Sequence, residues 1–108
     1  VEYNLFQNNS VTGFYRSLMA RNNHSNYNVF KNNTVEGYGA MKDNSNGGIS
    51  IWGGASYNVF ENNIIKNVTR FIEIYNNVEG ERDKKVMDGN IIRNNIFDSA
   101  YRGIDVSQ

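Results

Sequence analysis

Two acidic residues, Glu73 and Asp105, occupy the middle positions of two matching apolar-x-apolar segments. An arginine stands three residues before each acid, Arg70 in the first case and Arg102 in the second. If the segments stack as neighbouring parallel strands, the two carboxylates lie about 5 Å apart on one exposed face. Like charges opposed across strands are destabilising, so we expect a partner that offsets them.

Three kinds of chemistry would account for two carboxylates held so close together. We rank them in the following order. The first is internal neutralisation of the acids by Arg70 and Arg102. The second is a hard cation such as Ca²⁺, which prefers several oxygen ligands and would be bound by Glu73 and Asp105 together with an acidic sugar. The third is hydrolysis, because retaining glycosidases use carboxylates about 5 to 5.5 Å apart. The same two acids are therefore the catalytic candidates, and whether the chain is an enzyme stays open.

A row of aromatic and basic residues accompanies the acids. Arg21, Trp52 and Tyr75 each stand one alternation step further along their strands, on the same face as the acids. We predict that these three residues bind substrate, with Trp52 and Tyr75 stacking on sugar rings. The alternative, of equal weight, is that the two aromatic rings only cover neighbouring loops. The two largest insertions, 37–47 and 76–88, flank this face, as insertions in repeat proteins commonly do at a binding surface.

The segments that position these residues follow from an internal repeat. Four stretches align without gaps, YNLFQNNSV, YNVFKNNTV, YNVFENNII and GNIIRNNIF, and they share the pattern N-h-h-x-N-N-x-h, where h is apolar. Its first Asn recurs at positions 4, 28, 58 and 90. Of the 20 asparagines in the chain, 12 occupy the three Asn columns, so these asparagines are structural rather than a sign of disorder.

Asparagine suits stacked turns because it tolerates the left-handed backbone conformation and its amide both donates and accepts hydrogen bonds. We predict a ladder of Asn9, Asn33, Asn63 and Asn95, with one strand before each turn and another after it. A third strand follows as an apolar-x-apolar segment at 18–20, 49–51, 72–74 and 104–106. Gly48 and Gly103 are predicted to turn the chain into this third strand.

The repeat resembles that of the right-handed parallel β-helix superfamily, the pectate-lyase-like group of polysaccharide lyases, pectin hydrolases, alginate epimerases and phage tailspikes. The resemblance covers essentially the whole chain. It implies an all-β fold, a right-handed parallel β-helix (solenoid) of about four three-stranded coils with asparagine-ladder turns. We expect one domain over 1–108 that is a fragment of a longer solenoid.

Part of the chain, from NVFKNNTV to ISIWGGASYNVFENN, is also similar to the alginate and chondroitin lyase branch of that superfamily. In that branch a basic residue on the third strand serves catalysis. Trp52 and Gly53 stand at the comparable place here, so this catalytic role does not carry over.

Composition narrows the classes of partner. Basic and acidic residues number 11 each, so neither nucleic acid nor a membrane is an expected partner. The chain has no cysteine, which excludes disulfides and thiolate metal sites. The single histidine, His24, lies in an asparagine-rich loop and is interpreted as a solvated residue rather than a catalytic one.

These features together predict an extracellular or cell-surface β-helix segment that binds or modifies a polysaccharide or acidic glycan, like the lyase and epimerase scaffolds. One alternative is a structural or self-assembling β-solenoid, similar to a fibre or adhesin and without catalytic activity. Another is an inert repeat segment. Because the end strands expose unpaired edges, we expect end-to-end self-association or adjoining coils to cover them.

Overall fold

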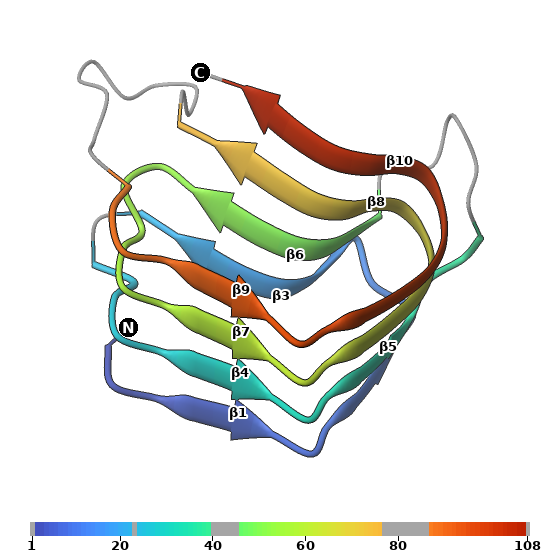
Figure 1. Ribbon diagram of the computed structural model, residues 1–108, viewed down its shortest axis with the longest axis horizontal. Coiled ribbons are helices and arrows are strands. Elements are labelled where there is room, and N and C mark those ends of the chain that lie inside the picture. Colours follow the sequence, from blue (N-terminus) through green and yellow to red (C-terminus); the bar gives the residue numbers. More distant parts are fainter. Residues whose placement is uncertain (1, 23, 40–45, 77–86, 108) are drawn as a thin grey trace.

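The computed structural model describes residues 2–22, 24–39, 46–76 and 87–107. Within these ranges the fold is all-β and contains no helix (Figure 1). The strands are β1 (Leu5–Gln7), β2 (Ser10–Thr12), β3 (Arg16–Arg21), β4 (Val29–Lys31), β5 (Thr34–Glu36), β6 (Gly47–Trp52), β7 (Val59–Glu61), β8 (Ile64–Tyr75), β9 (Ile91–Arg93) and β10 (Ile96–Ser107).

All paired strands run parallel, and each pair joins equivalent segments of successive repeats. The first sheet has the order β1-β4-β7-β9, with one strand from each repeat. Its register places Phe30 between Phe6 and Phe60, as the gapless alignment predicts. The second sheet contains β2, β5, β8, β6, β3 and β10. The predicted parallel β-structure and the alignment of the four repeats are therefore confirmed.

Three separate strands per repeat occur only in the first two repeats. In the third and fourth repeats, β8 and β10 continue for 12 residues each and replace both the second and the third strand. Each of these long strands bends at a single residue with positive φ, Asn67 (52°) in β8 and Ser99 (61°) in β10. The prediction of separate strands is wrong there, because one left-handed residue redirects the chain without interrupting the strand.

The predicted turn role of Gly48 and Gly103 is also wrong, because both glycines lie inside strands, β6 and β10. Gly48 is required by packing instead. A Cβ atom at this position would lie 2.6 Å from Cγ2 of Ile65 and 2.8 Å from the carbonyl oxygen of Phe71. A Cβ atom at Gly103 would meet no atom within 4 Å.

The predicted asparagine ladder is present. The side-chain amide of Asn33 donates to Oδ1 of Asn63 at 3.0 Å, and that of Asn63 donates to Oδ1 of Asn95 at 3.0 Å. The backbone N–H groups of Asn33 and Asn63 donate to the same two oxygens. A second ladder, which the sequence analysis did not predict, links Asn4, Asn28, Asn58 and Asn90.

Within each Asn-Asn pair of the repeat, the first asparagine has the left-handed backbone conformation. Its φ angles are 59°, 56°, 55° and 55° for Asn8, Asn32, Asn62 and Asn94. The two properties of asparagine are thus divided between adjacent positions: one residue turns the backbone, and the next satisfies buried polar groups.

The core lies between the two sheets. Phe6, Phe30 and Phe60 stack with ring centroids 4.8 and 4.6 Å apart. The aliphatic side chains of Val35, Ile49, Ile51, Ile65 and Val68 are fully buried beside them. Each fully buried large apolar side chain stabilises the fold by about 1.5–3 kcal/mol, so these columns supply the main driving force for folding.

Candidate functional site

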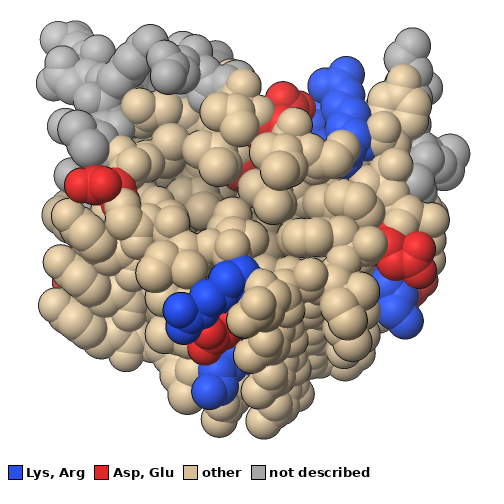
Figure 2. Space-filling model, viewed as in Figure 1, with Lys and Arg blue, Asp and Glu red and all other residues tan. Residues whose placement is uncertain are grey.

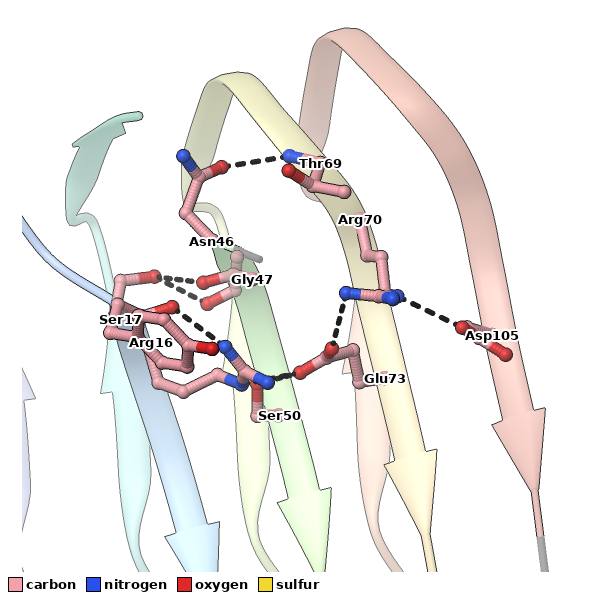
Figure 3. Close-up of polar contacts among 11 residues, drawn as sticks. Arg16, Ser17, Asn46, Gly47, Ser50, Thr69, Arg70, Glu73 and Asp105 are labelled. Carbon is pink, nitrogen blue, oxygen red and sulfur yellow. Dashed lines mark hydrogen bonds and ion pairs between the residues drawn. The ribbon is translucent and has the colours of Figure 1, made fainter. Parts of the chain in front are cut away.

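The candidate site lies on the face of the second sheet that points away from the core, where β3, β6, β8 and β10 run in parallel (Figure 3). The register places Met19, Ser50, Glu73 and Asp105 in one row. The next row contains Arg21, Trp52 and Tyr75. The predicted rows are confirmed, and they bring the sequence-predicted site residues together.

Arginines and carboxylates alternate through this face as a continuous chain of ion pairs, and Figure 3 shows the part of it from Arg16 to Asp105. Arg16 Nε lies 2.8 Å from Glu73 Oε2, and Arg70 Nη1 lies 3.2 Å from Glu73 Oε1. Arg70 also contacts Asp105, with 2.9 Å between Nε and Oδ2. Arg102 Nη1 completes the chain at 3.4 Å from the same Asp105 oxygen. Neutralisation by Arg70 and Arg102, the first-ranked chemistry, is therefore present.

Glu73 is less accessible than the sequence analysis expects. Only 6% of this residue is exposed, and its neighbour Ser50 is fully buried. The Ser50 hydroxyl donates to Glu73 Oε2 at 3.0 Å. The expectation that both acids lie on an exposed face is wrong for Glu73, because two guanidinium groups and a hydroxyl enclose its carboxylate.

Arg16 is a residue of the candidate site that the sequence analysis did not predict. In the sheet register it lies beside Gly47, which in turn pairs with Arg70. A Cβ atom at Gly47 would lie 2.8 Å from Glu73 Oε2, so the absence of a side chain leaves room for the buried carboxylate. A sequence signal for this contact is the alignment of Gly47 between Arg16 and Arg70 in successive repeats.

Trp52 is in contact with basic groups as well as with Tyr75. The Trp52 and Tyr75 ring centroids are 5.5 Å apart, and the ring planes are inclined by 44°. The guanidinium carbons of Arg16 and Arg21 lie 5.3 and 5.4 Å from the Trp52 centroid. Cation–π attraction at such distances orients the arginines against the ring. The three predicted substrate-binding residues thus form one cluster beside the ion-pair chain.

No group of three or more His, Asp or Glu side chains suited to a metal ion occurs among the described residues. Both oxygens of Glu73 contact arginine nitrogens, so a cation there would compete with two guanidinium groups. The Ca²⁺ site at Glu73 and Asp105 stays a prediction. His24 is exposed, as expected for a solvated loop residue. The insertions that flank the site lie largely at 40–45 and 77–86, outside the described residues.

The arrangement is better suited to binding anions than to acid–base chemistry. A carboxylate held by two guanidinium groups must lose an ion pair before it can act as a base or a nucleophile. The guanidinium groups offer five N–H donors each in a planar fork that matches a carboxylate. Three arginines against two acids leave the ion-pair chain with an excess positive charge.

Comparisons with family models, with curated proteins and with solved structures each find no match. No helix in the described part of the chain is long and apolar enough to cross a membrane.

Proposed function

We propose that the chain is a segment of a right-handed parallel β-helix and that its arginine-rich outer face binds an acidic polysaccharide outside the cell. Stacked parallel strands from repeats of 24 to 32 residues, joined by asparagine ladders, support the β-helix. The single observation that carries the binding function is the chain of arginines beside Trp52 and Tyr75.

The proposed ligand follows from the chemistry of these groups. A uronate residue carries a carboxylate, which an arginine binds through paired N–H donors, and a sugar ring, whose apolar face packs on aromatic side chains. Arg102 is the most accessible arginine of the ion-pair chain, with 54% of its side chain exposed. We infer that a polymer carboxylate binds at Arg102 and its neighbouring sugar rings at Tyr75 and Trp52.

The geometry of this face favours binding of the polysaccharide over its modification. Glu73 and Asp105 remain the catalytic candidates, but both participate in ion pairs. Binding without turnover needs no change in these pairs. We therefore propose binding as the function. Hydrolysis or lyase activity can be assayed with the same oligosaccharides that are used to measure binding.

Fluorescence titration tests the binding proposal directly, because Trp52 is the single tryptophan of the chain. Oligouronates should change the Trp52 emission, whereas neutral oligosaccharides of equal length should not. Arg102→Gln should weaken the affinity about 10-fold, as expected for loss of a charge-assisted hydrogen bond of about 1.5 kcal/mol. Repeating the titration with Ca²⁺ and with a chelator shows whether a cation participates.

Arg93→Gln is the matched control for this titration. Arg93 has 55% of its side chain exposed and pairs with Glu61 at 2.8 Å, but it lies in the first sheet. This variant should bind oligouronates like the parent. The proposal is refuted if the parent binds no oligouronate, or if the Arg102 and Arg93 variants lose affinity equally.

A further inference from the structure

Arg16 crosses a neighbouring strand to reach its ion-pair partner. It lies on β3, whereas Glu73 lies on β8, and β6 runs between these two strands. The residue of β6 beside Arg16 is Gly47. A Cβ atom at Gly47 would lie 2.8 Å from Glu73 Oε2 and 3.2 Å from its Cδ, so a side chain there would displace the carboxylate. Figure 3 shows the Arg16 side chain passing beside Gly47 to contact Glu73.

The same guanidinium group packs against aromatic rings. The guanidinium carbon of Arg16 lies 4.6 Å from the Tyr15 ring centroid and 5.3 Å from the Trp52 ring centroid. Its Nη1 donates to the Tyr15 carbonyl at 3.0 Å, and its Nε lies 2.8 Å from Glu73 Oε2. A planar group that is held at several atoms keeps one orientation. Arg16 thus presents an oriented surface to the Trp52 ring.

Glu73 is itself held by several contacts. Its Oε2 also accepts a hydrogen bond from the Ser50 hydroxyl at 3.0 Å, and its Oε1 lies 3.2 Å from Arg70 Nη1. Only 6% of Glu73 is exposed. A buried polar group with this many partners is rigid. Glu73 therefore begins a series of contacts that runs through Arg16 to Trp52, and all of its members face outward along the side of the stack.

We propose that Glu73 is a positioning residue, which acts through Arg16 to hold the Trp52 ring in the orientation that receives a sugar ring. This inference rests on the proposed binding function, and it gives Glu73 a role other than catalysis or metal binding. Among the described residues, no acceptor pairs with the buried Trp52 Nε1. Contacts with the ring, rather than a hydrogen bond, therefore set its orientation.

Preorganisation matters at this face because the chain has no net charge that would attract a polyanion. Basic and acidic residues number 11 each, and Figure 2 shows basic groups next to acidic groups on the side that it presents. Long-range attraction of an acidic ligand is then weak. Holding a contact side chain in place before the ligand arrives removes the cost of ordering it on binding, which corresponds to about 2- to 10-fold in affinity.

Three variants interrupt the Glu73–Arg16–Trp52 series at different points. Arg16→Lys keeps the charge but lacks the planar group, and Glu73→Gln removes the carboxylate charge. Gly47→Ala keeps both charged residues but displaces the carboxylate from Arg16. In the free protein, each variant should shift the Trp52 emission to longer wavelength and increase its quenching by acrylamide. Each should also weaken oligouronate binding about 2- to 10-fold.

Arg21→Lys is the matched control for the free protein. The guanidinium carbon of Arg21 lies 5.4 Å from the Trp52 centroid, almost the distance found for Arg16. No carboxylate in the described part of the chain forms an ion pair with Arg21. This variant should leave the emission and the acrylamide quenching of free Trp52 unchanged.

Asn63→Ala controls for a general loss of stability. Its side chain is fully buried and forms hydrogen bonds with the ladder and with the Phe30 carbonyl of β4. This variant should unfold more easily, but its folded form should show the parent's Trp52 quenching. A double variant with Arg16→Lys and Glu73→Gln should show no more quenching than the stronger single variant, because both changes break the same series.

The measurement on the free protein needs no ligand, so it separates this inference from the proposed function. Parent-like quenching in Arg16→Lys and Gly47→Ala overturns the positioning role, even if Glu73→Gln fails to fold and even if oligouronates bind. Increased quenching in Arg21→Lys or Asn63→Ala to the same extent also overturns it. A parent that shows the expected quenching pattern but binds no oligouronate refutes the proposed function and supports the link from Glu73 to Trp52.

Discussion

Replacing Asn63 with alanine removes the central link of the Asn9–Asn95 ladder. Its Oδ1 accepts hydrogen bonds from the backbone N–H and the side-chain amide of Asn33. Its Nδ2 donates to the Phe30 carbonyl at 3.0 Å and to Oδ1 of Asn95 at 3.0 Å. Asn63 is fully buried, so water does not replace these partners in the folded chain.

The size of the effect follows from the groups that lose a partner. The Asn33 side-chain amide keeps a bond to the Phe6 carbonyl, but the Asn33 N–H and the Phe30 carbonyl each lose the Asn63 side chain. A buried polar group left unpaired costs about 1–3 kcal/mol, so Asn63→Ala should lower the free energy of unfolding by about 2–6 kcal/mol. This is a large share of the about 5–15 kcal/mol that stabilises a typical domain.

Asn9→Ala is the control within the same ladder. Asn9 is exposed, and its side chain makes one ladder bond, from Nδ2 to Oδ1 of Asn33. This variant should lose less than about 1 kcal/mol. Urea unfolding followed by far-UV circular dichroism gives both values. If the two variants have the same unfolding free energy, the buried hydrogen bonds of Asn63 do not stabilise the fold.

Three further predictions concern packing and charge. Gly48→Ala should destabilise the fold by about 1–3 kcal/mol through overpacking, whereas Gly103→Ala, at the equivalent row position with open space around it, should be neutral or slightly stabilising in thermal unfolding. Equal effects of the two changes would contradict the packing argument. Glu73→Gln should lower the unfolding free energy by about 2–4 kcal/mol, because it leaves the arginine charges beside a neutral, largely buried side chain. Asp105→Asn, at a side chain that is 36% exposed, should lower it by no more than about 1 kcal/mol, and the reverse order in urea titrations would refute the role given to Glu73.

The strand register could be read from the sequence because it follows from a short local pattern. Side chains alternate along a strand, and each apolar-x-apolar segment marks which of its residues face the core and which face outward. The rows through Glu73 and Asp105, and through Trp52 and Tyr75, therefore agree with the structure. The ion pairs of Arg70 and Arg102 are expected from proximity along the chain, since each arginine stands three residues before its acid, but alternation alone would place residues three apart on opposite faces of a regular strand.

Tertiary structure alone decided the features that depend on space between the rows. Arg16 reaches Glu73 because Gly47 has no side chain, and the resulting enclosure buries the carboxylate. The continuity of β8 through Asn67 likewise depends on how one residue bends, which the repeat pattern does not encode. A repeat specifies which residues lie side by side, because pairing follows sequence spacing. Burial and contact depend on the volume that neighbouring repeats leave free, and that volume is defined only once all four repeats are stacked.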